Sequence, residues 1–300
     1  MARDVGMVGL GIMGSAMSAN LVKAGFTVHG FDPLPERRRA FARAGGKPAA
    51  NSAEVATSSG ILITSLPSAE ALESVTAEIT TTVRRGLIVV ETSTLPIEVK
   101  EAARKKFAIA GIVLLDCPLS GTGAQARVKD LVVLASGDAG AYRKCRKVFE
   151  GFARAHFLVG AFGDGSKMKF IANHLVAIHN VAAAEAMVLG MKAGLDPAQV
   201  YKVITSGAGS SRMLEVRGPM MVKGDYSQAT MKVGIWQKDM KIIGDYARSI
   251  DCPTPLFLAS AAFYTAAMAM GRGEEDTAAV CAVLEEWART PRSRNRRGRR

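Results

Sequence analysis

The sequence predicts an α/β domain followed by an all-α domain, joined by a long interdomain helix. Short apolar runs alternate with helical stretches through the first half of the 300-residue chain, and only helical patterns continue beyond residue 166. Such alternation builds a parallel sheet covered by helices. With 48% hydrophobic residues the chain can bury a substantial core, and its length favours two domains over one.

Seven apolar runs are the candidate strands of the first half. They span residues 5–10, 27–31, 61–65, 87–91, 112–116, 131–135 and 156–159. Helix signals separate them, among them Asn51 with Glu54 three residues later, which is a capping arrangement, and the Pro-initiated segment 35–44.

A glycine-rich turn joins the first candidate strand to the first helix. It reads Gly9-Leu10-Gly11-Ile12-Met13-Gly14. The first glycine permits a tight turn, the second lets a pyrophosphate approach the backbone, and the third lets helix and strand pack closely. The free N–H groups of the helix N-terminus then attract the phosphates.

An acidic residue completes this pattern. Asp32 ends the second candidate strand 21 residues after Gly11, where a βαβ unit presents a carboxylate to the adenosine ribose. A strand–turn–helix with merely flexible glycines is the alternative, and the second strand and Asp32 argue against it. We therefore expect a Rossmann-type domain whose six turn residues and Asp32 bind NAD, with NADP not excluded.

The net charge of +12 is concentrated at one end of the chain. Residues 290–300 carry six arginines and no acid, which is half of that charge. Such a block is typical of a solvated, disordered tail, and no aromatic residue interleaves the arginines to stack on bases. The composition therefore does not favour a nucleic-acid partner.

Targeting and metal signals are missing from the sequence. No secretory signal and no apolar run of about 18 to 20 residues is evident, so we expect a cytoplasmic protein without a membrane partner. The four cysteines form no C-x-x-C pair, and the four histidines show no metal-ligand spacing, so we assign no metal.

The second half begins with a long predicted helix over residues 166–193, on the order of 40 Å in length. Asp196-Pro197, Pro255 and the acidic run after Gly273 mark later helix starts. These signals place a dinucleotide-binding domain at 1–163, a helical substrate and dimerisation domain including the long helix at 164–290, and the tail at 291–300.

Two polar residues on the long helix are candidates for chemistry. Lys169 and Asn173 are four residues apart, so they share one face. A solvated lysine beside a surface asparagine is the alternative. However, the flanking residues are apolar, and the helix directly follows the nucleotide-binding half, where an interdomain cleft is expected.

Several segments together resemble one enzyme family. Residues 163–173, Gly-Asp-Gly-Ser-Lys-Met-Lys-Phe-Ile-Ala-Asn, resemble the catalytic segment of the β-hydroxyacid dehydrogenases. The glycine turn is similar to their G-L-G-x-M-G motif, residues 91–94 to their acidic-x-S-T loop, residues 116–121 to their D-x-P-x-S-G motif, and residues 237–240 to their K-D segment. The family includes 3-hydroxyisobutyrate and threonate dehydrogenases and the tartronate, glyoxylate and succinic semialdehyde reductases.

The resemblance implies the roles of the site residues. Lys169 is implied as the general acid/base and Asn173 as its substrate-orienting partner. The resemblance implies that the substrate carboxylate binds at Ser120, Gly121 and Thr122. It implies that the cofactor is bordered by Leu66, Pro67, Ser93 and Thr94. Lys238 is implied to lie near the substrate or cofactor, where Asp239 positions it. Without the resemblance, these are a polar turn, loop residues at strand ends and a surface ion pair.

Two departures from the family pattern leave the subfamily open. Thr122 stands where many members have glycine, and Ala172 where the 3-hydroxyisobutyrate type has a second asparagine. Ala172 is closer to the glyoxylate and succinic semialdehyde type. That type, however, usually carries an Arg after the second strand and uses NADPH, whereas this chain has Asp32 at that position.

The sequence thus predicts an NAD(P)-dependent oxidoreductase that interconverts a small hydroxy acid and its aldehyde or ketone. By the resemblance it is a homodimer or homotetramer. The alternative is a catalytically silent dinucleotide-binding protein that holds nucleic acid with its Arg-rich tail. Lys169 and Asn173 discriminate between the two, because a silent binder does not require them.

Overall fold

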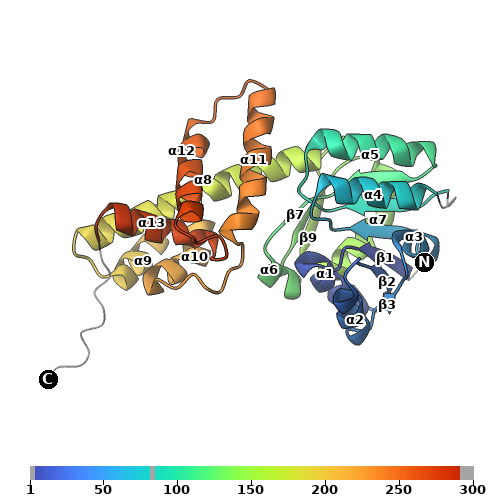
Figure 1. Cartoon of the computed structure of the whole chain (residues 1–300), viewed down its shortest axis with the longest axis horizontal. Coiled ribbons are helices and arrows are strands. Elements are labelled where there is room, and N and C mark those ends of the chain that lie inside the picture. The colour runs from blue at the N-terminus through green and yellow to red at the C-terminus, as the bar shows by residue number, and fades with distance from the viewer. Residues whose placement is uncertain (1–3, 82–84, 291–300) are drawn as a thin grey trace. The chain divides into compact units, whose positions relative to one another are not determined.

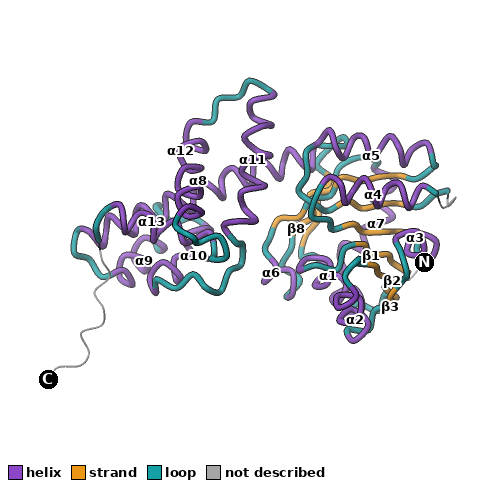
Figure 2. Tube along the Cα trace, viewed as in Figure 1, coloured by secondary structure: helices purple, strands orange, loops and turns teal. Residues whose placement is uncertain are grey.

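The computed structural model describes residues 4–81 and 85–290. Its contacts divide the chain into two compact units, Met1–Ile171 and Ala172–Arg300. Figure 2 shows strands and helices in the first unit, and helices and loops in the described part of the second. The boundary falls inside a helix, so the predicted division at residue 163 stays a prediction. The predicted tail lies outside the described residues.

The main sheet of the first unit is parallel throughout. Its order is β3-β2-β1-β4-β5-β6 (Figure 1). The order reverses between β1 and β4, and ligands of such sheets bind beyond the carboxyl ends of the strands at this reversal. The strands are β1 (Asp4–Val8), β2 (Thr27–Phe31), β3 (Lys47–Pro48), β4 (Ile61–Thr64), β5 (Ile88–Glu91) and β6 (Val113–Asp116).

Helices cover both faces of this sheet. Asn51 caps α3 as predicted, since its Oδ1 accepts from the backbone N–H of Glu54 at 2.8 Å and the Glu54 carboxylate accepts from Ala50 N–H at 2.7 Å. The helices of the first unit are α1 (Ile12–Lys23), α2 (Pro35–Arg43), α3 (Ser52–Ser58), α4 (Ala69–Thr80), α5 (Ile97–Ile109), α6 (Gly123–Arg127) and α7 (Ala139–Phe152).

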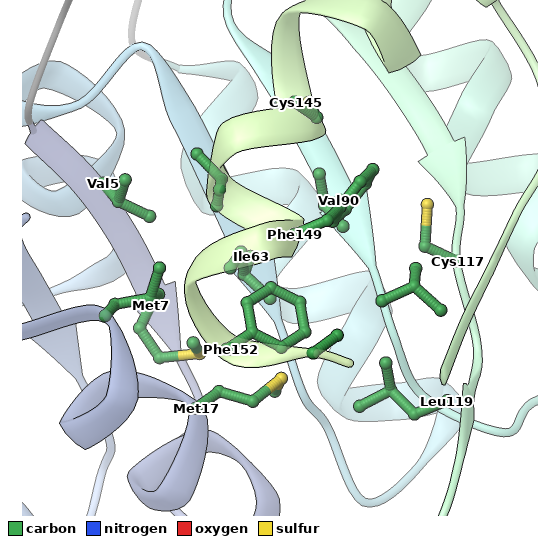
Figure 3. Packing of buried hydrophobic residues seen from close by; sticks show 14 of the residues in the cluster. Val5, Met7, Met17, Ile63, Val90, Cys117, Leu119, Cys145, Phe149 and Phe152 are labelled. Atoms are coloured by element: carbon green, nitrogen blue, oxygen red, sulfur yellow. The ribbon is translucent and has the colours of Figure 1, made fainter. Parts of the chain in front are cut away.

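Alternate strand residues enter two separate cores. On β4, Leu62 packs with the buried residues of α3, α4 and α5, whereas Ile63 packs with those of α1, α2 and α7. Figure 3 shows Phe149 and Phe152 of α7 among side chains of the sheet. Strands buried on both faces read as continuous apolar runs, which is why the sequence revealed them.

The last two predicted strands lie outside the main sheet. They are β8 (Val132–Ala135) and β9 (Ala155–Leu158), which form a second sheet with β7 (Leu119–Ser120), in the order β7-β8-β9. One antiparallel bridge, Asp116 to Ser136, links β6 to the end of β8. The sequence did not reveal β3 and β7, because two residues are too few to show periodicity.

The long helix α8 (Asp164–Lys192) spans the boundary between the units. In the second unit its buried Asn180 donates to the Tyr264 hydroxyl at 3.1 Å and to the Thr277 carbonyl at 2.9 Å. The elements that follow are α9 (Pro197–Thr205), α10 (Arg212–Lys223), α11 (Val233–Ser249), α12 (Pro255–Ala269), the 3₁₀ turn η1 (Thr277–Ala279) and α13 (Val280–Trp287).

The final helical segment begins directly after the predicted acidic run, with η1 starting at Thr277. Asp276, rather than Gly273 or the glutamates after it, is the cap of η1, because its carboxylate accepts from Ala278 N–H at 2.9 Å. Asp276 is completely buried.

Helix α8 is the one helix in the described part of the chain that is long and apolar enough to cross a membrane. The most apolar 18-residue window has a mean hydropathy of 1.3, and 44% of it is buried within the protein. A core helix of a soluble protein meets the same criterion.

Candidate active site

Two glycines of the predicted dinucleotide turn are required by the geometry. Gly9 has φ +91°, a conformation that other residues rarely adopt, and a Cβ there would overlap the Ser65 carbonyl oxygen. A Cβ on Gly14 would overlap the carbonyl oxygen of Gly9. The first glycine thus makes the turn, and the third lets α1 lie against it.

Gly11 faces open space instead. A Cβ added there would have a single neighbour within 4 Å among the described residues, the Arg37 guanidinium at 3.7 Å. Gly11 also has no side chain with which to cap α1, so the first N–H groups of the helix are available to an anion. An open cavity of about 470 Å³ lies here, lined by Leu10, Gly11, Ile12, Ser15, Ala16, Ala19, Arg37 and Arg127. These residues fit the pyrophosphate of a dinucleotide.

Asp32 lies at the carboxyl end of β2 and is 2% exposed. Its Oδ2 accepts from Leu10 N–H at 2.8 Å and from the Arg37 guanidinium at 3.2 Å, and its Oδ1 accepts from Leu34 N–H at 3.0 Å. The carboxylate therefore fastens the glycine turn to the loop after β2. Arg38 is held differently, because it donates to the Asp32 carbonyl oxygen at 2.5 Å and lies over the Phe31 ring.

The loops after β4 and β5 meet through Ser93. Its hydroxyl accepts from Leu66 N–H at 2.8 Å, and its own N–H donates to Glu91 Oε1 at 2.8 Å. Two of the predicted cofactor residues, Leu66 and Ser93, are thereby brought together, with Pro67 and Thr94 next to them in the chain.

The predicted carboxylate loop connects β7 to α6. Gly121 has φ +133°, and the Thr122 N–H and hydroxyl both donate to Gln125 Oε1, at 3.0 and 3.3 Å. A Cβ on Gly123 would overlap the side chain of Ile12. The loop that includes Ser120 therefore packs against the dinucleotide turn.

The predicted catalytic pair lies along α8. Lys169 is half-buried, and Asn173 is 5% exposed. Asn173 Nδ2 donates to Asp239 Oδ2 at 3.0 Å, and Lys238 Nζ lies 4.0 Å from Asp239 Oδ1. The structure thus brings Asn173, Lys238 and Asp239 together within the second unit.

Sequence reasoning missed a buried ionic cluster in the first unit. Lys100 Nζ lies 2.7 Å from Glu91 Oε2 and 2.8 Å from Asp116 Oδ1, and Asp116 also accepts from Ser166. Burial lowers the pKa of Lys100, but the two carboxylates outweigh burial, so the pKa is raised. The sequence held one signal that Lys100 is buried. It precedes Ala103 and Phe107 at helical spacing, so it lies on the apolar face of the helix.

The described residues offer no metal site. Within residues 4–81 and 85–290 no group of three or more His, Cys, Asp or Glu side chains could hold a metal ion. Cys117 and Cys145 are buried thiols, and burial raises the pKa of Cys145 to about 12.

Comparison with known proteins identifies both halves of the chain. Residues 4–160 match the family model for the NAD binding domain of 6-phosphogluconate dehydrogenase, and residues 163–284 match the NAD-binding model of NADP-dependent 3-hydroxyisobutyrate dehydrogenase.

Individual relatives match over almost their whole length. The chain is 37% identical to an L-threonate dehydrogenase of Cupriavidus necator, covering 95% of this chain and 97% of that protein. It is 28% identical to an NAD-dependent L-serine dehydrogenase of Pseudomonas aeruginosa, covering 93% and 96%. The structure of a Mycobacterium tuberculosis 3-hydroxyisobutyrate dehydrogenase with L-serine matches with a TM-score of 0.87 at 27% identity, covering 95% of this chain and 99% of that chain.

These relatives are dehydrogenases of small hydroxy acids, and none of them supports the silent-binder alternative. The glycine turn, the cavity beside it and both family models support a nicotinamide dinucleotide cofactor, and the NAD-dependent relative supports NAD, with NADP possible. The chain belongs to the β-hydroxyacid dehydrogenase family of NAD(P)-dependent oxidoreductases.

Proposed function

We propose that the enzyme oxidises L-threonate, or a closely similar small polyhydroxy acid, with Lys169 as the general base. The observation that carries the substrate is the 37% identity to an L-threonate dehydrogenase over 95% of the chain. Bound NAD would accept the hydride. Residues of this chain transfer the proton, orient the substrate and bind its carboxylate in this proposal.

Lys169 transfers the proton in this proposal. Removing hydride from a hydroxyl-bearing carbon requires a base for the hydroxyl proton, and the reverse reaction requires an acid and a positive charge beside the developing alkoxide. A neutral amine supplies the first and an ammonium group the second. The position of Lys169 on α8, one turn before Asn173, supports this role.

Asn173 orients the substrate. An ionised carboxylate only accepts hydrogen bonds, so Asp239 fixes which end of the amide faces it. Asn173 Oδ1 is then the end of the amide that can accept a hydrogen bond from a hydroxyl group of the substrate. Lys238, next to Asp239, supplies a positive charge for the substrate or cofactor.

The loop at Ser120, Gly121 and Thr122 holds the substrate carboxylate in this proposal. Since the Thr122 N–H and hydroxyl engage Gln125, the Ser120 hydroxyl and the Gly121 N–H are the principal donors. The dinucleotide binds at the residues of the glycine turn, Asp32, Leu66, Pro67, Ser93 and Thr94.

The substrate assignment is tested by a panel of hydroxy acids. NADH formation is measured with L-threonate, D-threonate, 3-hydroxyisobutyrate, L-serine and glycerate at equal concentrations. L-threonate is expected to give the highest kcat/KM. Highest turnover with 3-hydroxyisobutyrate would overturn the substrate while keeping the reaction class.

We further propose a soluble, cytoplasmic homodimer or homotetramer. Helices of the second unit expose large apolar side chains, including Leu189 at 71%, Leu256 at 67% and Val203 at 61%. Exposed apolar surface of this kind favours burial against another subunit. Sedimentation velocity measures the mass.

Cofactor preference is expected to favour NAD over NADP, because the buried Asp32 carboxylate repels a 2′-phosphate. Arg37 moderates this preference, since its guanidinium pairs with Asp32 but is 46% exposed and free to turn toward a phosphate. Arg37→Ala should lower kcat/KM for NADP by about 10- to 100-fold, the effect of losing a hydrogen bond to a charged group, and change that for NAD little.

Arg39→Ala is the matched control, because Arg39 is an exposed arginine of the same helix. For both variants, kcat and KM are measured with NAD and with NADP. An equal loss for NAD and NADP in Arg37→Ala would contradict the role of Arg37.

A further inference from the structure

Lys100 is a fully buried ammonium group between two buried carboxylates. Its Nζ lies 2.7 Å from Glu91 Oε2 and 2.8 Å from Asp116 Oδ1, and both acids are 0% exposed. The three side chains come from α5, the end of β5 and the end of β6. We call them the Lys100 triad.

Glu91 links the triad to the cofactor loop. Its second oxygen, Oε1, accepts from the Ser93 N–H at 2.8 Å, and the Ser93 hydroxyl in turn accepts from Leu66 N–H. The position of Glu91 therefore sets the loop that carries Ser93 and Thr94.

Asp116 links the triad to the start of α8. Its Oδ2 accepts from the Ser166 N–H at 2.8 Å, and its Oδ1 accepts from the Ser166 hydroxyl at 2.9 Å. Ser166 lies in the first turn of α8, three residues before Lys169. One ammonium group thus joins the cofactor loop to the turn that leads to Lys169.

The backbone around this turn leaves little freedom. A Cβ on Gly165 would overlap the Leu134 carbonyl oxygen and lie 2.8 Å from that of Asp116. The first turn of α8 is therefore pressed against the ends of β6 and β8. A shift of Asp116 would move it.

Stability alone is a poor reason for this arrangement. Burying three charges is costly, and well-packed apolar side chains of similar volume often stabilise a protein equally or better. A fixed geometry, by contrast, requires directional hydrogen bonds. Glu91 has such a bond from the Ser93 N–H, and Asp116 has one from the Ser166 N–H.

We propose that Lys100 is a positioning residue. Through Glu91 and Asp116 it holds the cofactor loop at Ser93 and the first turn of α8 in the relative position that proton transfer by Lys169 requires. This rests on the proposed function, because it takes Lys169 as the acid/base. A misplacement of about 1 Å far from the chemistry can cost about 100-fold in rate, so a small movement of this turn suffices.

The variants separate positioning from folding. Lys100→Met removes the ammonium, and the double variant Lys100→Met/Glu91→Gln also removes one of the buried carboxylate charges while keeping an oxygen for Ser93. Ser166→Ala removes a single hydrogen bond and keeps the backbone link to Asp116.

Each of the two single variants has a matched control. Lys105→Met makes the same change at an exposed position of α5. Ser52→Ala removes a hydroxyl at the start of α3 that is equally buried and makes no hydrogen bond with the described residues.

The kinetic readout is kcat measured well below the melting temperature, beside the NADH dissociation constant. We expect kcat to fall about 100-fold in Lys100→Met and about 10-fold in Ser166→Ala, with NADH affinity within about threefold of wild type, because misplacement affects the reacting groups and not the glycine turn. The double variant should recover melting temperature relative to Lys100→Met but not kcat. A purely structural role predicts recovery of both.

A second readout does not depend on turnover. Hydrogen exchange is expected to quicken in Lys100→Met at the amides of Ser93 and of residues 167–169 together, and in neither control. Turnover within threefold of the matched controls, or unchanged exchange at either segment, would overturn the positioning role. If the wild-type enzyme turned over no hydroxy acid, the proposed function would fail, and the exchange experiment would still decide whether the triad couples the two segments.

Discussion

Lys169→Ala is expected to lower kcat by about 10²- to 10⁴-fold, the usual contribution of a positioned proton donor or acceptor. Loss of the positive charge facing the developing alkoxide adds to this effect. NADH affinity should be retained, because the pyrophosphate is held by the glycine turn at Gly9–Gly14. Single-turnover kinetics and NADH fluorescence titration measure the two quantities.

Three further variants sharpen the result. Lys169→Arg should not restore turnover, since a guanidinium does not release its proton near neutral pH. Asn173→Ala should act more mildly and mainly on KM. Lys167→Ala is the control, because Lys167 lies on the same helix, two residues away, and its ammonium pairs with Asp164 at 2.9 Å. A Lys169→Ala enzyme with more than about a tenth of wild-type kcat would rule out general acid/base catalysis by this residue.

The cofactor half of the site was open to prediction because its signals are local. The glycine turn, the strand before it and Asp32 lie within one βαβ unit, and Gly14 is required by the carbonyl oxygen of Gly9, five residues before it. The Asn51 cap is local in the same way, since donor and acceptor are three residues apart. Residue spacing alone carries such information.

The Lys100 triad was not predictable by these means. Its members come from three elements, and Ser166 reaches Asp116 across 50 residues of chain. Spacing cannot say that a lysine on an apolar helix face meets two strand-end carboxylates, because that meeting depends on sheet order. Spacing likewise cannot give the hydrogen bond between Asn173 and Asp239, which are 66 residues apart, although the family resemblance implied both residues.

The second sheet escaped prediction for a related reason. Residues 131–135 have the apolar character of an inner strand, but the preceding segment returns as β7, which pairs antiparallel with β8 and thereby starts a separate sheet. Strand character is encoded locally, whereas the choice of sheet is set by the connection between strands. A two-residue strand such as β7 gives no periodic signal.

Breaking a second buried ion pair, in the helical unit, is expected to destabilise that unit strongly. Arg217 is 3% exposed, and its Nε donates to Asp276 Oδ1 at 3.1 Å. The carboxylate also accepts from the Thr230 N–H and hydroxyl and from the Met231 and Ala278 N–H groups. It therefore joins α10, the loop before α11 and η1.

Burial raises the pKa of Asp276, but Arg217 and these hydrogen bonds outweigh burial, so the pKa lies below its ordinary value. A carboxyl group whose folded-state pKa is depressed stabilises the fold above its unfolded-state pKa of about 4, and this contribution is lost as the pH falls through the folded-state value. Its stabilising effect is therefore complete at neutral pH.

Asp276→Asn should lower the free energy of unfolding of the helical unit by about 3 to 5 kcal/mol, because it leaves the Arg217 charge buried without its partner. Arg217→Met should cost a similar amount, and the double variant less than the sum of the two, since neither charge is then left alone. Both tryptophans of the chain, Trp236 and Trp287, lie in this unit, so tryptophan fluorescence during urea unfolding reports on it.

Arg212→Ala provides the control for this loss, since Arg212 pairs with Glu215 at 3.2 Å with side-chain exposures of 69% and 43%. An exposed pair of that kind contributes about 0 to 1 kcal/mol. The destabilisation by Asp276→Asn should shrink as the pH is lowered below about 4, where protonation removes the wild-type charge. A loss below about 1 kcal/mol at neutral pH, or a loss that stays constant as the pH falls, would show that neutral hydrogen bonds and not the charge of Asp276 hold these three segments together.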